Sequence, residues 1–192
     1  MKLIFAQGNP GPSYESTRHN IGFAVLDEVA KNSSLTFADK SKFQASIAET
    51  LINGEKVLFA KPLTFYNETG VAARSIADFY KLDPSTDVVV IHDELALPFG
   101  TIKTRLDGSD AGNNGIKSLN RHLGSRYARI RIGIYNQLRD QINDADFVLG
   151  KFTREEREAL PAIITQAAKY VSMFISDELT STKVTLSFEQ ND

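Results

Sequence analysis

MKLIFAQGNPGPSYESTRHN, residues 1–20, sets a predicted strand, a rigid turn and a helix start close together. The apolar run Leu3–Ala6 stops at a segment rich in Gly and Pro, which is typical of a buried strand that ends in a loop. Pro10 and Pro12 fix their own φ angles and keep the residues before them extended, so Asn9 is presented on a stiff turn. The residues after this stretch have apolar positions at helical spacing, which predicts a helix with Asn20 as its N-cap.

His19 would therefore lie just before a helix and near the carboxyl end of a strand. In open α/β sheets this is the edge at which ligands bind. Three other polar residues lie at the same kind of position, at a predicted strand end or helix start. Asn67 precedes a second amphipathic segment, Asp93 follows the β-branched run at residues 87–91, and Asn114 lies in a Gly-rich loop that opens another helix.

The order of these segments predicts an α/β fold. Asn53-Gly54 lies between two strand-like runs, which is a strong hairpin signal, while the other strands alternate with helices. We expect a twisted, mixed, mostly parallel β-sheet flanked by helices on both faces. The strand at residues 87–91 is expected to end at the polar residues 92–94. A capping box at Thr153 predicts a final long helix, which Pro161 is expected to kink or split.

Length and composition favour one soluble domain over residues 1–192. The chain has 192 residues, is 42% hydrophobic and contains no cysteine, which excludes disulfides, thiol nucleophiles and thiolate metal sites. Its N-terminal apolar run is too short for a signal peptide, and no segment approaches the ~20 apolar residues of a membrane span. We expect a cytoplasmic protein that does not associate with membranes.

The charge distribution is more informative than its total of −2. Residues 100–135 hold seven basic and two acidic residues, a net charge of +5, which leaves −7 for the rest of the chain. A charged segment is often only a solvated surface. A basic segment on an acidic body is also what contact with a phosphate backbone requires.

The polar residues at the predicted strand ends suit acid–base chemistry. A histidine titrates near neutral pH and can act as a base, and a carboxylate such as Asp93 would fix the tautomer of His19. The sequence has no G-x-S-x-G elbow, no cysteine, no metal-ligand spacing among its histidines and no match to the common nucleotide-binding loops. Water is therefore the expected nucleophile, with asparagine amides as donors to a developing oxyanion.

Five ordered motifs resemble those of bacterial-type peptidyl-tRNA hydrolases. They are GNPG at 8–11, TRHN at 17–20, the TFYN run ending at Asn67, HDEL at 92–95 and AGNNG at 111–115. RIRIGI at 129–134 and FVLGKF at 147–152 extend the resemblance over nearly the whole chain. The resemblance implies a monomeric, cofactor-free and metal-free α/β hydrolase. It would cleave the ester between a peptide and the terminal ribose of tRNA, and so recycle tRNA during translation.

The same resemblance assigns roles by position. His19 matches the catalytic base and Asp93 its orienting carboxylate. The expected substrate-binding residues are Asn9, Tyr14, Tyr66, Asn67 and Asn114, and the expected tRNA-binding residues are Lys103, Arg105 and Arg131.

Two positions depart from the usual motifs. Asn113 stands where the family usually has a histidine, so a titrating side chain is lost there. Tyr66 stands where a methionine is usual, next to the substrate-binding Asn67. Two alternative functions also fit parts of the sequence: a tRNA- or RNA-binding protein without turnover, which would use only the basic segment at 100–131, and a general esterase acting on small esters.

Overall fold

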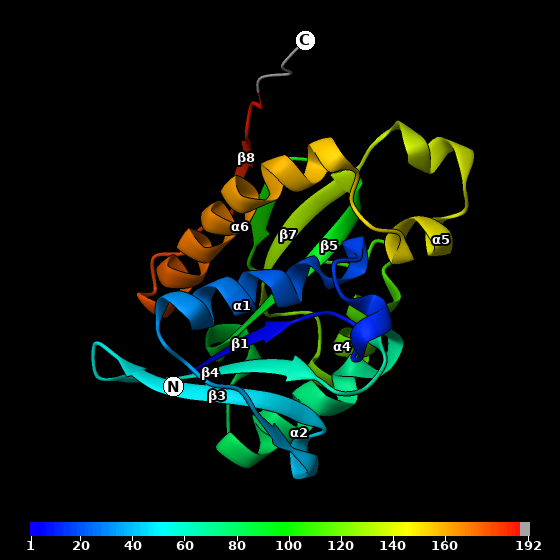
Figure 1. The fold of residues 1–192 in the computed structure, drawn as a ribbon. Helices are drawn as coiled ribbons and strands as arrows, with labels where there is room; N and C mark the ends of the chain where they lie inside the picture. Colours follow the sequence, from blue (N-terminus) through cyan, green and yellow to red (C-terminus); the bar gives the residue numbers. More distant parts are fainter. Residues whose placement is uncertain (189–192) are drawn as a thin grey trace.

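A mixed sheet of eight strands runs through the protein in the order β2-β3-β4-β1-β5-β7-β6-β8 (Figure 1). We describe residues 1–188 from a computed structural model. The four central strands are parallel: β4 (Glu55–Pro62), β1 (Lys2–Ala6), β5 (Val88–Pro98) and β7 (Ala128–Tyr135). The outer strands pair antiparallel: β2 (Ala38–Lys40), β3 (Ala45–Ile52), β6 (Thr101–Arg105) and β8 (Lys183–Thr185). The predicted mixed sheet with a parallel centre is confirmed.

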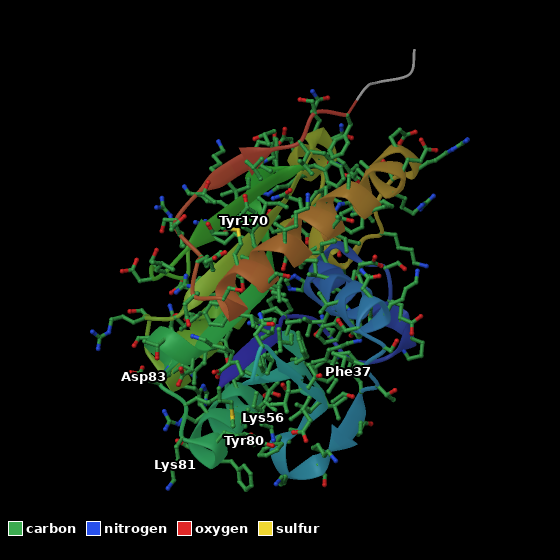
Figure 2. All side chains as sticks on the ribbon, turned by 90° about the vertical axis from the view of Figure 1, so that its left-hand side faces the viewer. Phe37, Lys56, Tyr80, Lys81, Asp83 and Tyr170 are labelled. Carbon is green, nitrogen blue, oxygen red and sulfur yellow. The ribbon has the colours of Figure 1, made fainter. Side chains whose placement is uncertain are left out.

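Helices cover both faces of this sheet (Figure 1). On one face α1 (Ile21–Asn32) and α6 (Arg154–Ile175) pack side by side over apolar residues of the central strands. Tyr170 of α6 lies in this layer, near the strands (Figure 2). On the other face lie α2 (Thr69–Tyr80) and α4 (Asn114–Leu123). The end of α2 places Tyr80 beside Lys56 of β4 (Figure 2).

Short helices fill the connections. They are η1 (Pro12–Tyr14), η2 (Arg18–Asn20), η3 (Ser41–Phe43), η4 (Tyr66–Glu68), α3 (Pro84–Asp87), η5 (Gln137–Gln141) and α5 (Asp144–Leu149). Two of these, η2 and η4, follow the parallel strands β1 and β4, so both lie at the carboxyl edge of the sheet, where ligands bind in α/β folds.

The sheet is wider than the helix pair α2–α4. The buried apolar strand residues beneath these two helices come from β1, β3, β4 and β5. Among residues 1–188, neither β6 nor β8 contributes a side chain to that cluster. Polar and basic side chains occupy this face of β6, β7 and β8 instead, which leaves an open basic area beside α4.

The hairpin prediction is confirmed, because β3 and β4 flank Asn53 and Gly54 with φ angles of 51° and 82°. The predicted end of this strand at residues 92–94 is wrong, because β5 continues to Pro98. Strand β5 pairs with β7 through Glu94 and again at Pro98, with a shift of register between them. Polar residues continue the strand here because the buried side chains of Asp93 and Glu94 both have hydrogen-bond partners.

Of the two predicted effects of Pro161, the split is wrong, since α6 is one unbroken helix of 22 residues. A reciprocal capping box between Thr153 and Glu156 fixes its first turn, and its apolar face packs on the sheet beyond Pro161. This packing holds the helix together although proline cannot donate a backbone hydrogen bond. In the part of the chain described, no helix is long and apolar enough to cross a membrane.

Candidate active site

A cleft of about 560 Å³ opens at the carboxyl edge of the central strands. Besides Tyr66, five other predicted site residues line it, and they are far apart in the sequence: Asn9, His19, Asn67, Asp93 and Asn114. Asn9 follows β1, His19 lies in η2, Asn67 lies in η4, Asp93 lies in β5 and Asn114 begins α4. The predicted convergence of these side chains on one edge is confirmed.

His19 and Asp93 form a hydrogen-bonded pair. Nδ1 of His19 lies 2.9 Å from Oδ2 of Asp93. An ionised carboxylate can only accept, so in the neutral ring Nδ1 carries the proton and Nε2 is the free nitrogen. Asp93 is fully buried while the His19 side chain keeps 15% of its exposure. The pair therefore has the tautomer and the access that a general base needs.

The carboxylate of Asp93 stays charged although it is buried. Burial alone would raise its pKa, but the His19 ring and the hydroxyl of Tyr66 outweigh burial, and the pKa of Asp93 is lowered from its ordinary value. His92, the preceding residue, points away from this cleft and donates from Nδ1 to the Asp93 carbonyl at 2.6 Å. Burial lowers the pKa of His92 to about 4, so it is neutral near pH 7. His92 therefore lies outside the cleft that Asp93 lines.

Asn9 is held by the side chain of Asn20. The Asn20 amide accepts from the Asn9 backbone N–H at 2.8 Å and donates to the Asn9 carbonyl at 2.9 Å. The Asn9 amide oxygen accepts from the backbone N–H of Tyr66 at 2.8 Å. A backbone N–H can only donate, so this contact fixes which end of the amide is oxygen and leaves the NH₂ group of Asn9 for a ligand.

This corrects the expected role of Asn20. It occupies the N-cap position of α1, but its side chain makes no capping hydrogen bond. Its two polar atoms bind the Asn9 backbone instead, which joins the turn after β1 to the start of α1.

The amides of Asn67 and Asn114 also line the cleft. Both residues are exposed, and within residues 1–188 neither side chain has a hydrogen-bond partner, so all their donors and acceptors can serve a substrate. Tyr14 does not line the cleft. Its ring lies edge-on to Phe65, a cleft residue, with 6.3 Å between the ring centroids.

A buried ion pair anchors the segment that carries His19. Arg18 is 1% exposed and donates to Glu156 of α6 at 2.7 Å and to the Lys151 carbonyl at 2.7 Å. Its guanidinium also stacks over Phe147, 4.4 Å from the ring centroid. These contacts tie η2 to α5 and to the first turn of α6, and so fix the backbone next to His19.

The predicted tRNA-binding residues lie outside the cleft, on the open face of β6, β7 and β8. Lys103 pairs in register with Arg131 of β7 on one side and with Lys183 of β8 on the other. Arg105, Arg131 and Lys183 together lower the pKa of Lys103, with Arg105 the largest cause. Like charges directly opposite one another destabilise a sheet, so this row is what a site for a polyanion would present.

Arg131 is part of an ion pair with Glu94. Its guanidinium donates twice to Oε2 of Glu94, at 2.7 and 2.9 Å. Glu94 follows Asp93 in β5, and neighbouring residues of a strand point to opposite faces. Asp93 thus reaches the cleft while Glu94 reaches the basic row, so the two regions meet on adjacent residues of one strand.

The sequence-based prediction missed Lys183, Asn20 as a clamp and the contact between Tyr66 and Asp93. Lys183 lies in a three-residue edge strand too short to give a periodic signal. For Asn20 the sequence favours a helix cap, because this is a common role of asparagine before an apolar helix. A tyrosine beside Asn67 gave no sign that its hydroxyl reaches β5.

The arrangement can activate a water molecule beside a bound carbonyl group. His19 supplies the base, Asp93 would stabilise the imidazolium, and the NH₂ groups of Asn9, Asn67 and Asn114 could donate to an oxyanion. Within the described residues, no group of three or more His, Asp or Glu side chains is placed to hold a metal ion.

Comparison with known proteins gives one family. The family model described as peptidyl-tRNA hydrolase matches residues 3–192. A peptidyl-tRNA hydrolase of Fusobacterium nucleatum is 43% identical over 176 residues, which cover 92% of this chain and 90% of that protein. Another from Geobacillus kaustophilus is 45% identical over 169 residues, or 88% of this chain and 89% of that protein.

Solved structures agree with the sequence comparison. The crystal structure of peptidyl-tRNA hydrolase from Acinetobacter baumannii is similar with a TM-score of 0.84 and 29% identity, and the match covers 93% of this chain and 90% of that one. A complex of a peptidyl-tRNA hydrolase with N-propanol is similar with a TM-score of 0.83 and 30% identity, covering 92% and 89% of the two chains.

Proposed function

The chain belongs to the peptidyl-tRNA hydrolase family, and from that premise we propose that it hydrolyses peptidyl-tRNA with His19 as general base. One observation supports this role above the others. His19 Nδ1 lies 2.9 Å from Asp93 in a cleft that also holds Asn9, Asn67 and Asn114. The chain has no cysteine, so a water molecule is the most direct nucleophile for this base.

In the first step Nε2 of His19 removes a proton from a water molecule while the water oxygen attacks the ester carbonyl carbon. The carbonyl oxygen becomes an oxyanion, and the imidazole becomes an imidazolium stabilised by Asp93. Amide NH₂ groups of the cleft asparagines donate to the oxyanion. One such donor was worth about 2.7 to 4 kcal/mol in a protease, so two or three would supply a large part of the acceleration.

In the second step the tetrahedral intermediate collapses. The bond from the carbonyl carbon to the ribose oxygen breaks, and the imidazolium returns its proton to that oxygen. The products are a tRNA with a free terminal hydroxyl and a peptide with a free carboxyl group, which loses its proton to solvent and becomes a carboxylate. His19 ends neutral and ready for another water molecule.

Neutral amides suit a substrate whose peptide part varies. They bind the main-chain carbonyl and N–H groups that every peptide has, and they do not titrate. The cleft would thus accept many peptide sequences, while the basic row of Lys103, Arg131 and Lys183 would hold the phosphates of the tRNA.

We further propose that the enzyme works as a single-domain monomer, because one chain carries both the cleft and the basic row. The cytoplasm is its proposed location, because translation there supplies peptidyl-tRNA. Gel filtration with light scattering would test the monomeric state, and a stable dimer that buries the cleft would contradict it.

Replacement of His19 by alanine tests the chemical proposal. We expect His19→Ala to lose roughly 10²–10⁴ of the rate of peptide release, the range of general-base catalysis, while its affinity for tRNA stays within twofold. His122→Ala is the matched control, since His122 lies on α4 outside the cleft lining. Unchanged turnover in His19→Ala would overturn the role of His19. Loss of tRNA affinity in step with activity would instead indicate a binding role.

A further inference from the structure

A second contact to Asp93 comes from Tyr66, which is 2% exposed. The Tyr66 hydroxyl lies 2.6 Å from Oδ1 of Asp93, the carboxylate oxygen that His19 does not use. The Tyr66 ring also lies parallel to the His19 ring, with 3.5 Å between the centroids and 13° between the planes. One side chain therefore contacts both members of the catalytic pair.

Asn113 fixes the direction of the Tyr66 hydroxyl. The Oδ1 atom of Asn113 accepts from the backbone N–H of Ile116 at 3.0 Å and caps α4. Its Nδ2 atom therefore faces Tyr66 and donates to the hydroxyl oxygen at 3.2 Å. An amide NH₂ cannot accept, so the single proton of the hydroxyl is directed at Asp93.

The packing around Tyr66 leaves little freedom for the ring. A Cβ atom on Gly115 would clash with Cε1 and Cδ1 of Tyr66, so only glycine allows α4 to approach this closely. Burial, together with the nearby Asp93 carboxylate, raises the pKa of Tyr66 well above its ordinary value. The hydroxyl thus keeps its proton and remains a donor over the pH range in which the enzyme acts.

From these contacts we propose that Tyr66, oriented by Asn113, is a positioning residue that holds the Asp93 carboxylate and the His19 ring in the geometry for water activation. This inference rests on the proposed function, since it assumes His19 as the base. The hydroxyl also stabilises the negative charge of Asp93, and a carboxylate so stabilised attracts the imidazolium less strongly. Tyr66 would therefore tune the basicity of His19 as well as its orientation.

Few charged or titratable groups near the pair could shift its pH dependence. The groups that face or flank the His19–Asp93 pair are Tyr66, His92, Glu94 and Asp144, which lines the cleft from α5. Glu94 is paired with Arg131 and Asp144 with Arg139. Neither of these carboxylates contacts Tyr66, so a change confined to the Tyr66 hydroxyl leaves both ion pairs intact.

The first test is Tyr66→Phe, which keeps the ring and its stacking and removes only the hydroxyl. We expect kcat to fall about tenfold with KM within twofold, and the acid limb of the kcat/KM profile to move up by half a pH unit or more, because Asp93 then favours the imidazolium more strongly. Tyr135→Phe is the matched control, since it removes a hydroxyl that donates to Asp140 on the surface. Wild-type kcat and an unmoved acid limb in Tyr66→Phe would overturn the proposal.

The second test asks whether Asn113 acts through Tyr66. Asn113→Ser keeps an oxygen that can cap α4 and removes the NH₂ donor. Alone it should lower kcat several-fold, but in the Tyr66→Phe background it should have little further effect. Equal losses in both backgrounds would overturn the role of Asn113. His19→Ala is assayed in parallel: full activity there would refute the proposed base, whereas an inactive His19→Ala beside an unaffected Tyr66→Phe would refute only this inference.

Discussion

The Asn20 side chain binds both backbone polar groups of Asn9, with hydrogen bonds of 2.8 and 2.9 Å. Both residues are buried, and they come from opposite sides of the turn that follows β1. His19 directly precedes Asn20 in the sequence. A single amide therefore sets the distance between a predicted oxyanion donor and the predicted base.

Loss of that amide should harm catalysis more than binding. Asn20→Ala would leave the N–H and carbonyl of Asn9 without partners, which costs about 1–3 kcal/mol of unfolding free energy. We expect kcat to fall about 10- to 100-fold because Asn9 and His19 lose their relative placement, with tRNA affinity unchanged. Single-turnover kinetics and denaturant unfolding measure the two effects. The control is Asn32→Ala at the other end of α1, where the amide donates to Glu28 in a hydrogen bond at the surface. Equal effects of the two variants would refute the clamp.

Breaking the buried pair of Arg18 and Glu156 should destabilise the fold strongly. Glu156→Gln leaves a buried guanidinium without its carboxylate, and removal of one member of a buried pair costs about 3–5 kcal/mol. Urea unfolding gives the value. Glu158→Gln on the same helix breaks only an exposed pair with Arg154, and should change stability by less than about 1 kcal/mol. A similar small change in Glu156→Gln would show that Arg18 does not depend on its partner.

Stability should fall as the pH is lowered from 6.5 toward 4. The pKa of His92 falls from 6.5 to about 4 on folding, chiefly through burial. Between those values the unfolded chain binds a proton that the folded protein does not, so the unfolding free energy rises with pH, by up to ~1.4 kcal/mol per pH unit. Urea unfolding at a series of pH values measures the slope. His92→Gln should flatten it over this range, and an unchanged slope in that variant would assign the effect to other groups.

We expect Lys183 to strengthen tRNA binding, the role also proposed for Lys103. Lys183→Ala and Lys103→Ala should each lower tRNA affinity and reduce the slope of log affinity against log salt by roughly 1, the share of one phosphate contact. Their kcat values should stay near wild type. Lys169→Ala removes a lysine of α6 on the other side of the sheet and should change neither quantity. An unaltered salt slope in Lys183→Ala would exclude β8 from the interface.

Most of the fold could be predicted from the sequence because its signals are local. Asn53-Gly54 specifies a hairpin by its backbone preferences, and Thr153 with Glu156 specifies a helix start. The extent of β5 could not be predicted, because its polar residues are stabilised by partners from η2, η4 and β7 that lie far away in the chain. The intact α6 across Pro161 likewise depends on tertiary packing.

The site residues could be predicted as a set, but their connections could not. The structure brings Asn9, His19, Asn67, Asp93 and Asn114 to one cleft, as expected. Tyr66 and Asn113 looked like two separate departures from the usual motifs, one beside the peptide and one in a Gly-rich loop. In the folded protein they contact each other, and Tyr66 contacts Asp93, a relation that sequence spacing does not carry.

Chemical rescue of His19→Ala in single-turnover hydrolysis of peptidyl-tRNA tests the central claim most directly. With enzyme in excess, we predict that the variant binds substrate, releases peptide roughly 10²–10⁴ times more slowly than wild type, and regains part of the rate when imidazole is added. The rescued rate should follow the unprotonated fraction of the added imidazole, as expected for a base. A wild-type rate in His19→Ala without imidazole would contradict the account.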